Sequence, residues 1–158
     1  MKESDINFND VKMGELVDID AKVKELLDSK QCVEVIQLMD TALEKEQTSA
    51  YYFYRAYARN KISKNWDKNF KLILDDLNKA IAIDNDEDSL YLKFYVLEHY
   101  LSIKAQEDDY RYIKDVNEQG EYVYYDDDEI PPNPDQPELD KYSLMMDETI
   151  NILIKQYP

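Results

Sequence analysis

Apolar residues recur at three- and four-residue steps through the first two thirds of the chain, a spacing typical of amphipathic helices. The pattern predicts five helices there, over residues 17–27, 33–46, 49–62, 66–83 and 89–105. Only a few polar residues separate the first two helices, so we expect them to pack as an antiparallel pair. The run from Asp84 to Asp88 places carboxylates just before the fifth helix, where they favour a helix N-terminus.

Beyond residue 105 the helical pattern gives way to tyrosine and β-branched residues. Residues 110–116 (YRYIKDV) and 121–125 (EYVYY) flank a turn at 117–120, which predicts a β-hairpin. Residues 126–137 hold four of the five prolines, so we expect an exposed loop. A last helix over residues 138–156 should dock on the helices before the hairpin with one broad apolar face, made of Leu139, Tyr142, Met145, Met146, Ile150, Leu153 and Ile154.

The predicted fold is mostly α, a single domain over residues 1–158 made of antiparallel helix pairs with a small β-hairpin insertion. The length of 158 residues suits one domain, and folding at that length buries a core without disulfides or metal. No stretch approaches the roughly 18 consecutive apolar residues of a membrane span, and the first ten residues lack the apolar core of a signal peptide. Because a lone cysteine is typical of a reducing compartment, we expect a cytoplasmic protein.

Two of the predicted helices begin alike, 40 residues apart. Residues 49–57 (SAYYFYRAY) and 89–97 (SLYLKFYVL) share a serine at the first position and aromatic residues at the third and sixth. Residues 74–86 (LDDLNKAIAIDND) resemble the second helix and exit turn of a tetratricopeptide repeat (TPR), and residues 52–56 (YFYRA) resemble the first helix of the same unit. Over about residues 17–105 the chain therefore resembles a divergent TPR protein. The pattern departs at Ile73, where a small residue is usual, and at Asn85, where proline is usual.

This resemblance implies that the helix pairs stack into one continuous core and leave a concave groove. In a TPR-like unit the first helix of each pair lines that groove. The residues that this rule places near the groove are Phe53, Tyr57, Asn60, Lys61, Leu92, Val96 and His99.

Charge is unevenly distributed along the chain, which carries 19 Lys+Arg and 35 Asp+Glu for a formal net charge of −16. Residues 1–83 hold 13 basic against 15 acidic residues, a net of −2, while residues 84–158 hold 6 against 20, a net of −14. The stretch from Arg55 to Lys71 is locally basic and includes Lys64 and Trp66, so RNA binding by stacking and charge is one alternative. The overall charge repels phosphate backbones and anionic lipids, and we therefore expect neither nucleic acid nor a membrane as partner.

Composition also argues against several kinds of catalytic and metal site. Two glycines cannot build a phosphate-binding loop, and one cysteine (Cys32) with one histidine (His99) cannot supply a Cys/His zinc site. We expect Cys32 to be buried at a contact between helices. Residues 84–88 (DNDED) imitate the start of an EF-hand, but Ser89 and Tyr95 stand where the loop needs Gly and Glu. We therefore predict no catalytic residue, cofactor or metal, and keep a carboxylate- and metal-dependent enzyme as the alternative of a different class.

The 14 tyrosines point most directly to a function. Tyrosine combines a large contact area with a hydrogen-bonding tip and is enriched at protein interfaces, and a two-stranded hairpin cannot bury all of its own. We predict a non-catalytic interaction module whose acidic C-terminal half binds a basic protein. The predicted partner-binding residues are Tyr122, Tyr124, Tyr125, Asp126, Asp127, Asp128 and Glu129. Such a protein resembles an immunity protein that neutralises a bacterial toxin, or a TPR-type chaperone or adaptor of a secreted effector, and the sequence leaves both open.

Overall fold

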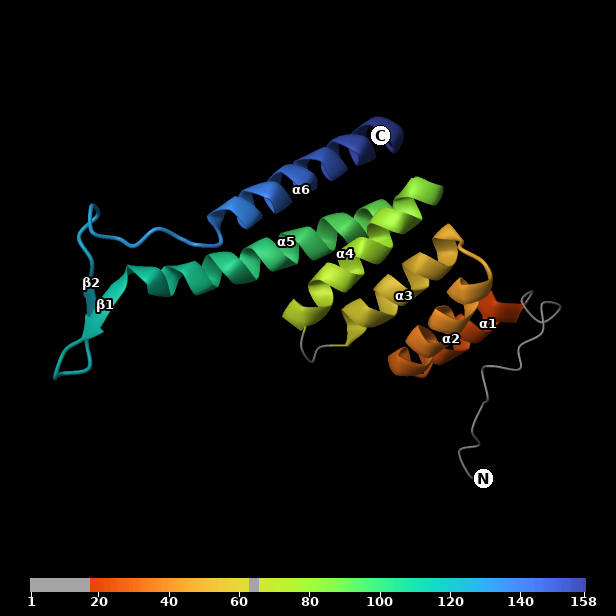
Figure 1. The fold of residues 1–158 in the computed structure, drawn as a ribbon, viewed down its shortest axis with the longest axis horizontal. Coiled ribbons are helices and arrows are strands. Elements are labelled where there is room, and N and C mark those ends of the chain that lie inside the picture. The colour runs from red at the N-terminus through yellow and green to blue at the C-terminus, as the bar shows by residue number, and fades with distance from the viewer. Residues whose placement is uncertain (1–17, 63–65) are drawn as a thin grey trace, which may run out of the picture. The chain divides into compact units, whose positions relative to one another are not determined.

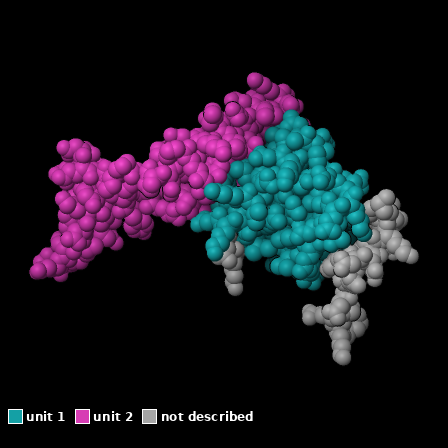
Figure 2. Space-filling view, in the orientation of Figure 1, with its two compact units in different colours: residues 1–92 teal, residues 93–158 magenta. Residues whose placement is uncertain are grey.

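The computed structural model describes residues 18–62 and 66–158, and this part of the chain is mostly helical (Figure 1). It contains six α-helices, one short 3-10 helix and one two-stranded antiparallel sheet, which confirms the predicted mostly-α class with a small hairpin. Val17 and Lys64, which entered the sequence analysis, lie outside the described residues. Contacts within the chain divide it into two compact units, residues 1–92 (unit 1) and 93–158 (unit 2; Figure 2). The single domain predicted over residues 1–158 stays a prediction.

Unit 1 contains the helices α1 (Ile19–Asp28), α2 (Cys32–Lys45), α3 (Ser49–Lys61) and α4 (Trp66–Ile83), and the start of α5 (Glu87–Asp109). From α1 to α4, successive helices pack on one another in chain order, which confirms the helix-pair packing (Figure 1). The observed bounds of α1, α2 and α3 differ from the predicted ones by at most two residues, and those of α4 agree at both ends. Helix α5 begins two residues earlier than predicted because Asp86 caps it: the Asp86 Oδ1 accepts the backbone N–H of Ser89 at 2.8 Å.

One apolar cluster in the core of unit 1 has members from α1, α2, α3 and α4. Its members are Ile19, Val23, Leu26, Val35, Leu38, Met39, Ala42, Leu43, Tyr51, Tyr52, Ala58 and Ala80. The turn between α1 and α2 depends on Lys30, whose φ of 59° lies in the left-handed region. The N–H of Gln31 donates to the Leu26 carbonyl at 2.8 Å, which closes α1 in an arrangement that usually has glycine at the left-handed position.

One carboxylate, that of Asp76 on α4, lies almost completely inside unit 1, with 1% of the side chain exposed. Arg55 of α3 holds it with two hydrogen bonds, from Nε to Oδ2 at 2.9 Å and from Nη2 to Oδ1 at 2.7 Å. Arg59, one turn further along α3, donates Nη1 to Oδ2 at 2.5 Å. Arg55 also donates to Asp40 of α2 at 2.7 Å. This Asp76 cluster (Asp40, Arg55, Arg59 and Asp76) therefore joins three helices, and its cations offset the cost of burying the charge.

Unit 2 contains the rest of α5, the 3-10 helix η3 (Tyr110–Tyr112), the strands β1 (Ile113–Val116) and β2 (Tyr122–Tyr124), and α6 (Gln136–Gln156). Within this unit α6 contacts α5 through an edge-to-face pair of Tyr100 and Tyr142, with ring centroids 5.4 Å apart. The buried residues of α6 are Tyr142, Thr149 and Leu153. Ile150 and Ile154, predicted on the docking face, are 36% and 62% exposed, so the buried stripe is narrower than predicted.

Several boundaries in unit 2 also differ from the prediction. Helix α5 ends at Asp109, four residues beyond the predicted end. Residues 110–112, predicted as strand, form η3, and β1 begins only at Ile113. Gln136 and Pro137, predicted in the loop, belong to the first turn of α6. Proline is tolerated there because the first N–H groups of a helix have no intrahelical acceptor to lose.

Replacing Asp76 with alanine leaves two guanidinium groups without the carboxylate that they share. We expect Asp76→Ala to lower the free energy of unfolding by about 3–5 kcal/mol, because breaking a buried ion pair leaves the remaining charges unpaired inside the protein. The matched control is Asp75→Ala, which removes the neighbouring exposed carboxylate that pairs with Lys79 at 2.7 Å. That change should cost less than about 1 kcal/mol. Urea denaturation followed by circular dichroism measures both, and equal losses would contradict the prediction.

Candidate functional site

The residues predicted to bind a partner lie on a hairpin arm, residues 110–129. Strands β1 and β2 pair antiparallel, with Ile113 opposite Tyr124 and Val116 opposite Tyr122, and the register shifts between residues 113 and 115. Asn117 closes the turn, since its Oδ1 accepts two backbone N–H groups at 3.1 and 2.9 Å. The predicted turn at residues 117–120 is confirmed, and it forms because an Asn side chain readily bonds its own local backbone.

The base of the arm is fastened by Arg111. Its Nε and Nη2 donate to the two carboxylate oxygens of Asp108 at 2.7 and 2.9 Å, and its Nη1 donates to the Pro131 carbonyl. Asn133 adds a hydrogen bond to Asp108 at 2.9 Å. Hydrogen bonding by the guanidinium lowers the pKa of the Asp108 carboxyl group. This Arg111 latch (Asp108, Arg111, Pro131 and Asn133) ties the segments on both sides of the hairpin to the end of α5.

The arm exposes most of its aromatic and acidic side chains. Its most exposed tyrosines are Tyr110 (71%), Tyr124 (62%) and Tyr122 (58%). Tyr125 is half-buried, with the Lys114 Nζ 5.6 Å from its ring centroid. Residues 126–129 are all exposed, and Glu129 pairs with Lys114 at 3.4 Å. With seven acidic against two basic residues, the arm carries a net charge of −5.

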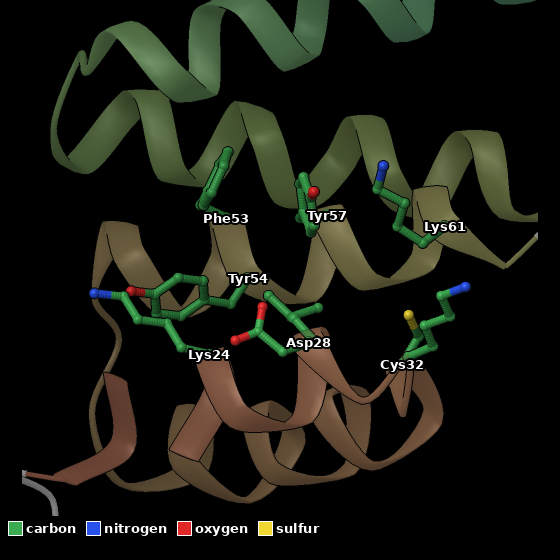
Figure 3. A pocket seen from close by; sticks show the side chains of 9 residues that line it. Lys24, Asp28, Cys32, Phe53, Tyr54, Tyr57 and Lys61 are labelled. Atoms are coloured by element: carbon green, nitrogen blue, oxygen red, sulfur yellow. The ribbon is translucent and has the colours of Figure 1, made fainter. Parts of the chain in front are cut away.

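Three of the predicted groove residues line a pocket of about 570 Å³ between the α1–α2 corner and α3, here called the α1–α3 pocket (Figure 3). Phe53, Tyr57 and Lys61 follow one another at four-residue steps, which places them on one face of α3. The ring centroids of Phe53 and Tyr57 are 6.0 Å apart, and the Lys61 Nζ lies 5.1 Å from the Tyr57 centroid. The structure therefore brings these three side chains together into an aromatic wall with a cation at its end.

The other four predicted groove residues do not line this pocket. The Asn60 side-chain oxygen accepts the Trp66 indole N–H at 3.1 Å, which links the end of α3 to the start of α4. On α5, Leu92 is half-buried and Val96 is completely buried. His99 is exposed and stacks on Tyr95, with ring centroids 6.1 Å apart.

Sequence reasoning missed the opposite wall of the α1–α3 pocket. The further lining residues are Lys24, Leu27, Asp28, Lys30, Cys32 and Tyr54. Most of them belong to α1 or its C-terminal turn, the first helix of the first pair, so the groove rule applied to that helix would have found them. Cys32, expected to be buried between helices, is half-buried at the pocket, because it stands in the first turn of α2 beside this opening.

Tyr54 ties the two walls of the pocket together. Its hydroxyl group donates to the Asp20 Oδ1 at 2.9 Å, which joins α3 to α1. Burial, together with this hydrogen bond to a carboxylate, raises the pKa of Tyr54 to about 12. Tyr54 therefore keeps its hydroxyl proton at pH values at which tyrosine ordinarily loses it.

A second, smaller hollow of about 220 Å³ adjoins Phe53 and Tyr54, here called the aspartate hollow. Its lining residues are Ser49, Ala50, Phe53, Tyr54, Asp84, Asp86 and Asp88. The Asp86 carboxylate is engaged by the Ser49 hydroxyl group at 3.2 Å and by the cap of α5, whereas Asp84 and Asp88 are exposed. Phe53 and Tyr54 thus stand between a lysine-rimmed pocket and an aspartate-lined one.

Over residues 18–62 and 66–158, no group of three or more His, Cys, Asp or Glu side chains is arranged to hold a metal ion. In the same part of the chain, no helix is long and apolar enough to cross a membrane. The predicted absence of catalytic residues, cofactor and metal stays a prediction.

The Tyr54 hydrogen bond gives the stability of the protein a characteristic pH dependence. At pH 8, Tyr54→Phe should lower the free energy of unfolding by about 1 kcal/mol. Because the folded-state pKa is raised above the ordinary 10.0 to about 12, this contribution is complete below pH 10 and is lost as the pH rises toward 12. The difference between the variant and the natural protein should therefore shrink between pH 8 and pH 11. Urea denaturation at both pH values measures it, and a constant difference would refute the assignment.

Comparison with known proteins identifies no relative of this chain. No family model matches the chain, and no curated protein or solved structure matches it. The arm and the pocket of this mostly helical chain are therefore the features from which its function has to be argued.

Proposed function

We propose that this chain is a non-catalytic protein-recognition module whose hairpin arm binds a basic protein. The observation that carries the proposal is the exposure of Tyr122 and Tyr124, at 58% and 62%, on an element held in place by the Arg111 latch. Tyrosines that serve the core of this unit are buried, as Tyr100 and Tyr142 are. Large apolar side chains exposed together and bordered by charges are typical of protein interaction sites.

Charge defines the kind of partner. The arm has a net charge of −5, within a C-terminal half of −14, so a basic surface is attracted and an acidic one is repelled. The exposed carboxylates at residues 126–129 act mainly on encounter, because solvent screens such charges once contact is made. The tyrosines supply the contact that loses water on binding and therefore slows dissociation.

We further propose a TPR-like arrangement for the pairs α1–α2 and α3–α4, which is supported by their pairwise packing. The similar sequences near the starts of α3 and α5 support the same kind of repeat. The role that we favour is neutralisation of a basic bacterial toxin, as an immunity protein performs it. A toxin that binds nucleic acid presents the positive surface that this arm complements. The single cysteine fits a cytoplasmic site of action.

Affinity purification from the source cells at low salt tests whether the arm selects a basic partner. We expect the natural chain to retain a protein rich in Lys and Arg, and the variant Asp126→Asn/Asp127→Asn/Asp128→Asn to retain much less of it, because the attracting charge is removed. The control Lys24→Glu/Lys61→Glu alters only the α1–α3 pocket and should retain the partner. The proposal would be refuted if the Asp→Asn variant retained as much of the basic protein as the natural chain does. It would also be refuted if the natural chain retained only acidic proteins.

Kinetics with the captured partner separate the roles of charge and tyrosine. The three Asp→Asn changes should slow association and flatten its salt dependence. Tyr124→Ala should instead raise the dissociation rate by about fivefold or more, the effect of losing an aromatic anchor worth about 1 kcal/mol. Tyr124→Phe keeps the ring and serves as the control. An unchanged dissociation rate in Tyr124→Ala would show that the tyrosine is not an anchor.

A further inference from the structure

The α1–α3 pocket has a rim of lysine side chains that outnumber the carboxylates in its lining. Lys24, Lys30 and Lys61 line it together with a single carboxylate, Asp28. Within the described ranges 18–62 and 66–158, no carboxylate forms an ion pair with any of the three lysines. Three ammonium groups against one carboxylate favour an anionic ligand along the rim of this pocket.

The wall of the same pocket is apolar. Phe53 and Tyr57 line it with their rings (Figure 3). Leu27 of α1 also lines it. The Lys61 ammonium group lies 5.1 Å from the centre of the Tyr57 ring, so the cation is held at the edge of the aromatic surface. A volume of about 570 Å³ accommodates a large side chain with part of its backbone. The pocket is therefore suited to an apolar anchor that has acidic neighbours.

The other side of Phe53 and Tyr54 has the opposite charge. Both rings also line the aspartate hollow, where Asp84 and Asp88 are exposed. The hollow lies at the start of α3, beside Ser49, and Lys61 closes the same helix. Helix α3 has 13 residues and is roughly 20 Å long, a distance that an extended segment of about six residues spans.

From this arrangement we infer that unit 1 binds an extended segment of a second protein whose charge changes sign across an apolar anchor. The acidic residues of the segment lie against the lysine rim of the pocket, which has Lys61 at one end and Lys24 at the Phe53 end (Figure 3). The apolar anchor enters the α1–α3 pocket beside Phe53, and the basic part reaches the aspartate hollow. This surface is separate from the hairpin arm and recognises a different chemistry, so it goes beyond the proposed function.

Two synthetic peptides with blocked termini and the same composition test the inference. The charge-split peptide has an acidic stretch, a central Trp-Leu pair and a basic stretch, and the charge-mixed peptide has its acidic and basic residues alternating around the same pair. We expect the charge-split peptide to bind at least about tenfold more tightly at low salt, with the advantage lost at high salt, because only that order matches the two hollows. Fluorescence anisotropy of labelled peptides measures both affinities.

Cys32 provides a readout at the site itself. It is the one cysteine in the sequence and it lines the α1–α3 pocket. A bound anchor should block access to its thiol, so saturating charge-split peptide should slow alkylation of Cys32 by iodoacetamide. Tight binding with no change in the alkylation rate would place the peptide elsewhere and overturn the inference.

Substitutions around the pocket keep the test independent of folding. Lys24→Glu/Lys61→Glu should weaken binding about tenfold, while Lys68→Glu/Lys71→Glu, the same two charge reversals on the exposed surface of α4, should not. Lys30→Gly removes a rim cation and also relieves the left-handed backbone at φ 59°. That variant should bind more weakly and yet melt no lower than the natural protein, so its loss of binding cannot be attributed to unfolding.

Three further results would overturn the inference. The first is equal affinity for the two peptides. The second is charge-split binding that survives Lys24→Glu/Lys61→Glu but is lost on Asp126→Asn/Asp127→Asn/Asp128→Asn, which would place the basic stretch on the arm. The third is self-association that the lysine reversals abolish, because the occupant would then be the acidic arm of a second copy. Sedimentation of each variant without peptide identifies this last case.

Discussion

The architecture of unit 1 depends on one buried carboxylate, that of Asp76. Arg55 and Arg59 hold it from α3, and Arg55 extends the cluster to Asp40 on α2. Burying a charge is unfavourable unless ions of opposite sign and hydrogen bonds surround it, and here two guanidinium groups provide both. Because a bidentate pair fixes direction as well as distance, the cluster sets the rotation of α3 about its own axis. Any other rotation would leave the Asp76 charge unpaired inside the protein.

That rotation determines which side chains reach the surface. Arg55 and Arg59 occupy one face of α3, and the spacing of Phe53, Tyr57 and Lys61 puts these three on the opposite face. With the arginines fixed on Asp76, the aromatic side chains must line the α1–α3 pocket. The hydrogen bond from Tyr54 to Asp20 then sets the separation of the two walls. The proposed binding surface is therefore a consequence of the same contact that stabilises the helices.

Unit 2 uses tyrosine in two ways. Tyr100 and Tyr142 are buried and pack edge to face between α5 and α6, whereas the arm exposes Tyr122 and Tyr124. A two-stranded sheet has no third layer against which to bury such rings, and the Arg111 latch, not a core, fastens it to α5. Together with the net charge of −14 over residues 84–158, these exposed tyrosines are the basis of the proposed basic partner of the arm.

The sequence by itself determined the elements, because helix periodicity, turn chemistry and charge are local properties of the chain. It predicted α4 at both ends, the turn at residues 117–120 and the acidic C-terminal half. Only the tertiary structure decided which of the adjacent carboxylates Asp75 and Asp76 is buried with a partner, since the arginines that pair with Asp76 lie 21 and 17 residues away. The same holds for the α1–α3 pocket, whose walls come from different helices, and for Ile154, which is exposed although the neighbouring Leu153 is buried. Such features require contacts between distant segments, and local sequence patterns do not encode which distant segments meet.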